Sequence, residues 1–241
     1  MDSDRQRLLA TMPLHAITGT YGEQGLRDRF ETEIASFPQA DRDRLDRALG
    51  LAARLHADDS RQREPYLNHL LRVAVRIITY YGVRDTDVIT AALLHDAVED
   101  HAADLAGGGQ EAALAVLAEE FGPRVAELVG AVTNPPWSPG RDSHEQYREH
   151  VADSLGRCPW ARVIKASDFT DNGTGIIHTT GPMVDKLASK YAPLVPVLRE
   201  LISRDDTPLD AAAKELILSQ LDTAAERFAA ILPASELPSD S

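Results

Sequence analysis

Cysteine, aromatic residues and long apolar runs are all scarce in this sequence of 241 residues. The single cysteine, Cys158, cannot form an internal disulfide, so the fold has to rest on side-chain packing or on a metal. No apolar run approaches the ~20 residues that a membrane span requires, and the first residues, Met1–Arg5, are unlike a signal peptide. We therefore expect a soluble, cytoplasmic protein.

Basic residues are also in the minority. Lysine and arginine total 25 against 38 aspartates and glutamates, which gives a formal net charge of −13. A protein that binds the phosphate backbone of nucleic acids needs a basic face, and so does one that binds an anionic membrane surface. The charge balance therefore argues against nucleic acid and against a membrane as partners.

Apolar and helix-forming residues are abundant. Apolar residues make up 43% of the chain and charged residues 26%, which is typical of a globular protein with a real core. Helical spacing places apolar residues on one face in several segments, and no segment alternates in the manner of a half-buried strand. Such faces are formed by Leu70, Val73, Ala74, Ile77 and Tyr81, by Val125, Leu128, Val129 and Val132, and by Leu209, Ala213, Leu216, Ile217, Leu221, Ala224 and Phe228. We predict an all-α fold.

Glycine and proline mark where the predicted helices end. We expect a loop at Gly19–Gly25, a longer irregular connection at Pro135–Gly140, and a break after Tyr191 caused by Pro193 and Pro196. The sequence is predicted to comprise, in order, an N-terminal helical arm at 1–45, a helical core at 46–204, a closing helix at 205–232 and a disordered tail at 233–241.

An acidic cluster with a histidine lies in an apolar segment that we expect to form one helix, Thr90–Asp100. Burying such groups is costly unless each is paired or bound to a metal. His95 and Glu99 are four residues apart, as are Asp96 and Asp100, so all four should project to one side. His95 and Asp96 could then bind a metal, while the other pair handles water. The alternatives are that His95 and Asp96 form a helix cap or a satisfied core pair, and that Glu99 and Asp100 are a solvated helix end.

His69 and Asp168 could complete such a site, because each lies in an otherwise apolar helical context. Two histidines with two aspartates suit Mn²⁺, Fe²⁺ or Zn²⁺ better than Ca²⁺ or Mg²⁺. Lys165 and Asn172 should share a helix face with Asp168. Lys165 could contact a phosphate or could form a structural ion pair with one of the acids. His56, at the end of a predicted helix, is expected to be structural.

Four blocks of sequence occur in an order and at spacings that resemble a known family. The blocks are Arg61 with Glu64–His69, Ala91–Asp100, Phe121–Thr133, and Lys165–Asn172, with Tyr191–Leu194 beyond them. Over about half of the chain they resemble the HD-domain hydrolases of the alarmone (p)ppGpp, which include the hydrolase half of Rel/SpoT proteins and the small alarmone hydrolases. The resemblance implies an HD-domain helical bundle that removes pyrophosphate from the 3′ position of an alarmone nucleotide.

The same resemblance implies a role for individual residues. His69, His95, Asp96 and Asp168 match four metal ligands, usually of Mn²⁺, and Glu99 with Asp100 matches the acidic pair that positions and activates the attacking water. The resemblance also assigns Arg61 to the base pocket and Asn172 to a nucleotide contact. We add Arg63 and Lys165 as candidate substrate contacts, since arginine and lysine bind phosphate well.

The chain departs from this family at three points. The loop before Glu64 is one residue shorter and reads Gln62-Arg63, the residues after Asp168 read Phe169-Thr170-Asp171, and His101 replaces a threonine. We therefore expect the alarmone substrate to be ppGpp, pppGpp or ppApp, with relaxed choice of the purine base between ppGpp and ppApp.

Two other functions remain open from the sequence. One is an HD-domain phosphohydrolase acting on another nucleotide or phosphorylated metabolite, and the other is an antitoxin that acts by binding. A nucleotide substrate, a cognate toxin and a second copy of the chain are the candidate partners.

Overall fold

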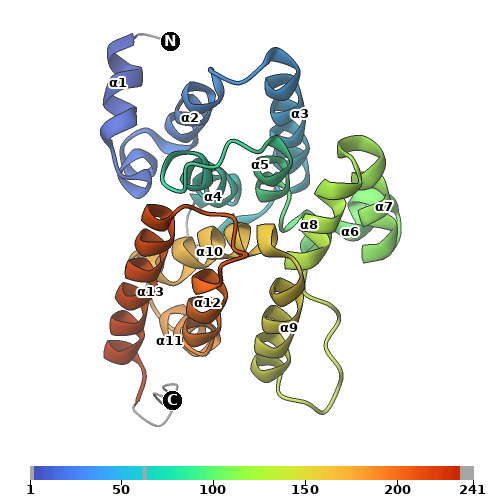
Figure 1. Cartoon of the computed structure of the whole chain (residues 1–241), viewed down its shortest axis with the longest axis vertical. Coiled ribbons are helices and arrows are strands. Elements are labelled where there is room, and N and C mark those ends of the chain that lie inside the picture. The colour runs from blue at the N-terminus through green and yellow to red at the C-terminus, as the bar shows by residue number, and fades with distance from the viewer. Residues whose placement is uncertain (1–2, 62–63, 234–241) are drawn as a thin grey trace. The chain divides into compact units, whose positions relative to one another are not determined.

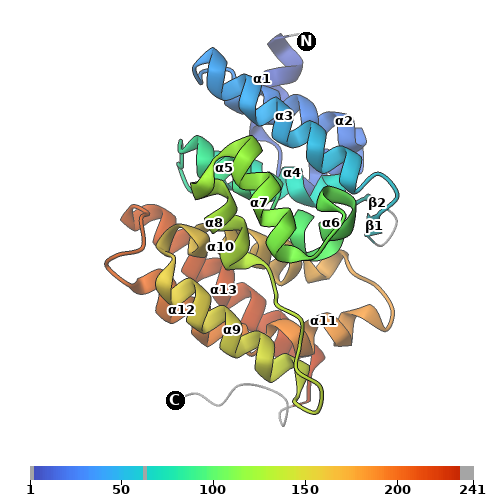
Figure 2. The ribbon, with the colours of Figure 1, turned by 90° about the vertical axis from the view of Figure 1, so that its right-hand side faces the viewer.

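Helices account for almost all regular structure in the computed structural model, which describes residues 3–61 and 64–233 (Figure 1). The prediction of an all-α fold is confirmed. One two-stranded antiparallel hairpin accompanies the helices: β1 (Ser60–Arg61) pairs with β2 (Glu64–Pro65), with Arg61 opposite Glu64. The hairpin follows the end of α3 (Figure 2). Among the described residues no helix is long and apolar enough to cross a membrane.

Contacts between Cα atoms divide the chain into two units, 1–130 and 131–241. The predicted boundaries after residues 45 and 204 stay predictions. Of the predicted tail, 234–241 lies outside the described residues. The two units are described separately.

The first unit is built around α4, which is buried along nearly its whole length and packs against α2, α3 and α5. Its apolar face, predicted from Leu70 to Tyr81, is buried as expected. The helices of this unit are α1 (Ser3–Thr11), α2 (Leu14–Ile34), α3 (Gln39–Leu55), α4 (Leu67–Thr79), α5 (Thr86–Leu93), α6 (Ala97–Ala106), α7 (Gln110–Phe121) and α8 (Pro123–Val132), which ends just beyond the boundary.

The loop predicted at Gly19–Gly25 is wrong, because α2 runs through this segment with a kink. Gly22 takes a positive φ of 63°, which a glycine adopts without steric cost, and the helix continues beyond it. Gly25 serves another purpose. A Cβ at this position would lie 2.5 Å from Cβ of Tyr21, so only glycine fits so close a contact.

The single helix predicted at Thr90–Asp100 is also wrong. The helix α5 ends at Leu93 and α6 begins at Ala97. The N–H of Leu94 donates to both Thr90 O and Ala91 O, which tightens the last turn, and Leu94 leaves the helical conformation with φ −109° and ψ 8°. No glycine or proline marks this break in the sequence. It places His95 and Asp96 in a turn between two helices.

The second unit is built around α10, which is buried from Ala161 to Asn172 and packs against α9, α12 and α13. Its elements are α9 (Ser143–Arg157), α10 (Pro159–Asn172), the 3₁₀ helix η1 (Thr174–His178), α11 (Met183–Tyr191), α12 (Leu194–Ser203) and α13 (Ala211–Ile231). The break after Tyr191 is confirmed: Pro193 stands before α12, although Pro196 fits within its first turn. The segment Pro135–Gly140 is irregular, as predicted.

Candidate metal centre and active site

A glutamate fastens the hairpin to the start of α4. The two carboxylate oxygens of Glu64 accept hydrogen bonds from the Arg72 guanidinium at 2.8 and 3.0 Å, and one also accepts from Asn68 Nδ2 at 3.0 Å. A two-pronged arginine–carboxylate pair fixes both position and orientation. It therefore holds the chain segment that carries Tyr66 and His69.

Three atoms of the first unit that could bind a metal lie close together beside the break between α5 and α6. Nε2 of His95 lies 3.1 Å from Oδ2 of Asp96, and Nε2 of His69 lies 3.7 Å from the same oxygen. Both imidazoles are buried. Metal–ligand bonds of ~2.0–2.2 Å place neighbouring ligand atoms about 3–3.6 Å apart, so this spacing suits a shared ion.

The orientation of His95 is fixed by its other ring nitrogen. Nδ1 lies 2.8 Å from the carbonyl oxygen of Ala92, so Nδ1 carries the proton and donates it. This leaves the lone pair of Nε2 directed at the site. Metal-binding histidines usually show such a bond, which sets the tautomer and the plane of the ring.

Tyr66 holds Asp96 from the opposite side. Its hydroxyl donates to Oδ2 of Asp96 at 2.7 Å. Burial of the phenol and the nearby charge of Asp96 raise the pKa of Tyr66 far above its usual value, so the hydroxyl stays protonated and keeps donating. Asp96 occupies the N-cap position of α6, yet its side chain makes no capping bond. Its carboxylate is directed at the site instead.

Glu99 and Asp100 lie in the first turn of α6, where the helix dipole favours negative charge. Partial burial and the charges of Asp96 and Glu99 raise the pKa of Asp100 to about 6. A carboxylate with this pKa can accept a proton near neutral pH. Asp100 therefore has the basicity of a proton acceptor, and it lies one helical turn after Asp96.

Arg61 lies next to the same tyrosine. Its guanidinium stands 4.8 Å from the centre of the Tyr66 ring, and Nη2 lies 3.5 Å from the Tyr66 hydroxyl. Arg61 is thus one side chain away from Asp96. Arg63, the other predicted contact of this loop, lies outside the described residues, as does Gln62.

In the second unit, α10 holds Asp168 between two partners. Lys165 Nζ lies 2.9 Å from Oδ2, and Asn172 Nδ2 donates to Oδ1 at 2.6 Å, so the three share a face as predicted. Burial opposes the charge of Lys165, but Asp168 with Tyr147 and Tyr191 raises the pKa of Lys165 well above its usual value. The structure thus shows the ion pair that the sequence left as one alternative for Lys165.

Several known proteins are similar to this chain in sequence, and one solved structure is similar to it in fold. A family model described as the HD domain matches residues 48–148. The guanosine-3′,5′-bis(diphosphate) 3′-pyrophosphohydrolase MESH1 of Drosophila melanogaster is 31% identical over 142 residues, which cover 58% of this chain and 71% of that protein. The chain belongs to this family of HD-domain pyrophosphohydrolases. The human MESH1 is 34% identical over 125 residues, which are 50% of this chain and 63% of that protein.

Longer relatives and a solved structure belong to the same group. A pyrophosphohydrolase of the same name from Aquifex aeolicus is 31% identical over 153 residues, or 63% of this chain, which spans 20% of that protein. A solved structure described as a metazoan ortholog of SpoT that hydrolyses ppGpp has a TM-score of 0.58 and 26% identity, covering 77% of this chain and 96% of its own. Membership of the HD-domain pyrophosphohydrolases, with the donor set at Asp96, implies a divalent metal.

Sequence analysis of this HD-domain pyrophosphohydrolase missed Tyr66 as a site residue. The signal was present: Tyr66 precedes His69 by three residues in the Glu64–His69 block, which puts both on one side of a helix start. Its partner Asp96 follows thirty residues later. That long-range hydrogen bond is visible only in the folded chain.

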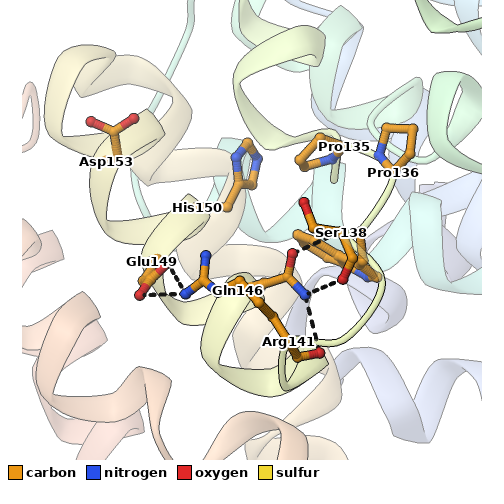
Figure 3. A pocket seen from close by; sticks show the side chains of 9 residues that line it. Pro135, Pro136, Ser138, Arg141, Gln146, Glu149, His150 and Asp153 are labelled. Atoms are coloured by element: carbon orange, nitrogen blue, oxygen red, sulfur yellow. Dashed lines mark hydrogen bonds and ion pairs between the residues drawn. The ribbon is translucent and has the colours of Figure 1, made fainter.

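A surface pocket in the second unit contains none of the predicted site residues. It has a volume of about 400 Å³ and lies between the irregular segment 134–142 and α9 (Figure 3). Gln146 orders the segment by accepting from Ser138 N at 2.8 Å and donating to Ser138 O at 3.2 Å. Arg141 is paired with Glu149 at 2.9 Å. The charges that line the pocket are therefore largely neutralised within it.

Proposed function

We propose that the chain removes pyrophosphate from the 3′ position of alarmone nucleotides, ppGpp, pppGpp or ppApp, as part of the stringent response in the cytoplasm. The observation that carries this proposal is the pair of imidazole Nε2 atoms at 3.1 and 3.7 Å from one oxygen of Asp96, one turn before an acidic pair. The activities named for the relatives supply the substrate class.

The proposed cofactor is one Mn²⁺ per chain, with Fe²⁺ or Zn²⁺ as alternatives suited to the same donors. His69, His95 and Asp96 would hold it, and we propose Asp168 of the second unit as the fourth ligand. Its support is chemical: Asp168 is a buried carboxylate paired with Lys165, and a carboxylate is a ligand type that suits these metals. A divalent ion bound there would lower the pKa of water and neutralise charge on the bridging phosphate.

Side chains of the protein would orient the water, accept its proton and bind the nucleotide. Glu99 and Asp100 would orient the attacking water, and Asp100 would take its proton. Arg61 and Arg63 would hold the negative charge and the base of the nucleotide. Lys165 and Asn172 remain proposed as substrate contacts, and their bonds to Asp168 give them a second task, that of holding this carboxylate in place. Attack by water on the phosphorus of the 3′ ester breaks its bond to the ribose 3′ oxygen, which must gain a proton as it leaves, and the proton that Asp100 takes from the water is available to balance this step.

Product analysis tests the proposed reaction. The metal-free protein would be incubated with Mn²⁺ and, in turn, with ppGpp, pppGpp, ppApp and ordinary nucleotides, and the products separated by chromatography. We expect pyrophosphate with GDP, GTP or ADP from the three alarmones, no product without metal, and none from the His95→Ala variant. Turnover of other phosphate esters alone would favour a different HD-domain hydrolase. Neutralisation of a toxin partner that survives His95→Ala would favour an antitoxin acting by binding.

Elemental analysis tests the ligand set separately. Asp168→Ala should lose bound Mn²⁺, whereas Glu99→Gln should retain the metal and lose turnover by ~100-fold, the usual scale for a group that assists proton transfer. Asp185→Ala, on an exposed part of α11, is the matched control. Full metal content in Asp168→Ala would remove Asp168 from the ligand set.

A further inference from the structure

A second cluster of two imidazoles and a carboxylate lies in the first unit, apart from the donors at Asp96. His56 ends α3, Asp59 lies in the connection to β1, and His101 belongs to α6. Oδ2 of Asp59 lies 2.7 Å from Nδ1 of His56 and 2.6 Å from Nε2 of His101. One potential ligand atom from each residue falls within 4.8 Å of the other two.

His101 is turned and held toward this cluster. The backbone of α6 departs from helical geometry at this residue, with φ −128° and ψ 27°. The distal nitrogen, Nδ1, lies 3.1 Å from a carboxylate oxygen of Asp104, which leaves Nε2 facing Asp59. A carboxylate that holds the distal nitrogen of a histidine is the usual support of an imidazole ligand, since it sets the tautomer and raises the basicity of the ligating atom.

His56 is positioned equally firmly. Its side chain is only 1% exposed and stacks on the Tyr66 ring, with ring centres 4.6 Å apart and an angle of 7° between the planes. Its second nitrogen, Nε2, has no hydrogen-bond partner among the described residues. Burial lowers the pKa of His56, which favours the neutral imidazole that a metal requires. The Asp59 side chain is about a third exposed, so solvent ions can reach the cluster.

We propose that Nδ1 of His56, Oδ2 of Asp59 and Nε2 of His101 form a second metal site that takes a divalent transition ion of the zinc class, with water in the fourth position. Two imidazoles and one carboxylate match the three-ligand sets of open zinc sites. Ca²⁺ and Mg²⁺ are excluded because they prefer sets made of oxygen alone. The site is independent of the proposed alarmone hydrolysis and of the ion at His69, His95 and Asp96.

Binding of the ion requires only that two protons of the cluster move. On binding, His56 moves its proton from Nδ1 to Nε2, where no bond has to be broken, and His101 loses the proton on Nε2 to solvent while Nδ1–H stays on Asp104. Asp59, the most exposed member, would move outward on binding, because ligand atoms around an ion with bonds of ~2.0–2.1 Å lie farther apart than the present 2.6 and 2.7 Å. The ion would tie the end of α3 to the helix that carries Glu99 and Asp100.

Metal counting tests this site. Metal-free protein would be loaded with excess Zn²⁺ or Co²⁺, desalted and analysed for bound metal by mass spectrometry, with circular dichroism as the check on folding. We expect two equivalents in the wild type, one in His101→Ala and one in Asp59→Asn. His144→Ala, an exposed histidine on α9, is the matched control and should keep two. The Co²⁺ form should lose part of its visible absorption in His101→Ala.

Equal metal content in the wild type and His101→Ala, whether one equivalent or two, would overturn the proposal. A second measurement uses the His69→Ala variant, in which the first site is disabled: Zn²⁺ should raise its melting temperature, and should not raise that of His69→Ala/His101→Ala. Identical responses would also overturn it. Failure of the proposed function would appear elsewhere, as wild-type protein with Mn²⁺ that leaves all three alarmones intact.

Discussion

Asp96 stands where an aspartate normally caps a helix, but its carboxylate faces His69, His95 and the Tyr66 hydroxyl. The first turn of α6 thus gives up a capping bond that is typically worth ~1 kcal/mol. A residue placed against its local preference marks a functional position. Tyr66 compensates in part, because its hydrogen bond fixes the carboxylate that the helix end leaves unused.

Removing the Tyr66 hydroxyl should therefore weaken metal binding without unfolding the protein. In Tyr66→Phe the ring still stacks on His56, but Asp96 loses one donor. We expect the affinity for Mn²⁺ to fall about 10-fold, the lower end of the range for groups that orient a metal ligand, as measured by competition with a chelating dye. Tyr80→Phe, at an exposed position, is the control and should match the wild type. Equal affinity in both variants would deny Tyr66 this role.

The raised pKa of Asp100 predicts how turnover depends on pH. Asp100 must be ionised to accept a proton, and its pKa of about 6 means that it is mostly protonated below that pH. A divalent ion at Asp96 lowers this pKa, so we expect kcat of the metal-loaded protein to fall about tenfold per pH unit on an acid limb at or below pH 6, and to be level above pH 6. Asp100→Asn should show low turnover with no such acid limb. A wild-type profile that stays flat down to pH 4.5 would rule out Asp100 as the proton acceptor.

The raised pKa of Asp100 also predicts how the stability of the metal-free protein depends on pH. The pKa of Asp100 is about 6 when folded against about 3.9 when unfolded, so the metal-free wild type loses stability as pH rises from about 4 to about 6. Asp100→Asn lacks this loss. At pH 8 it should exceed the wild type by the order of 1 kcal/mol, discounted because the side chain keeps contact with water, and the two should converge near pH 4 in urea unfolding. A variant that is less stable than the wild type at pH 8 would contradict this.

Elements differ in how well their sequences predict them. The apolar face of α4 and the residues sharing a face with Asp168 on α10 follow the helical period, because buried contacts repeat every turn. The face predicted on α13 is buried from Ala213 to Phe228 except at Leu216, which is 37% exposed and was wrongly predicted. The break at Leu94 could not be predicted, since it has no glycine or proline and depends on where His95 and Asp96 find their distant partners. The residues proposed to bind the metal could be chosen from the sequence by their type. The hydrogen bonds that position them, from Tyr66 to Asp96 and from Arg72 to Glu64, could not.

Two glycines of α2 should respond in opposite ways to alanine. Gly19 has no atom within 4 Å of the position that a Cβ would occupy, so Gly19→Ala should stabilise the protein by about 0.5–1 kcal/mol through helix propensity. Gly25→Ala would force its Cβ to 2.5 Å from that of Tyr21 and should destabilise it by about 1–3 kcal/mol. Urea unfolding of the two variants measures this. The same sign for both would show that the contact at Tyr21 relaxes freely.

The whole molecule selects its substrate partly by the purine base, which is guanine in ppGpp and adenine in ppApp. Arg61 packs one face of its guanidinium on the Tyr66 ring, and its other face would cover either purine, a contact worth about 1–2 kcal/mol when desolvated. We expect ppApp and ppGpp to be hydrolysed with kcat/KM values within about tenfold, or about 1.4 kcal/mol, and Arg61→Ala to weaken both alike. Steady-state kinetics on both nucleotides measures this. A thousandfold difference would require a pocket that binds one exocyclic group by hydrogen bonds.

The division of the chain at residue 130 has a consequence for spectroscopy. Both tryptophans, Trp137 and Trp160, fall in the second unit, and the first unit has none. Tryptophan fluorescence therefore reports on the second unit, which contains Asp168, and not on the first unit, which contains His69, His95 and Asp96, whereas circular dichroism reports on both. Coincident transitions by the two signals would mean that the units unfold as one cooperative system, and separate transitions that each half melts independently.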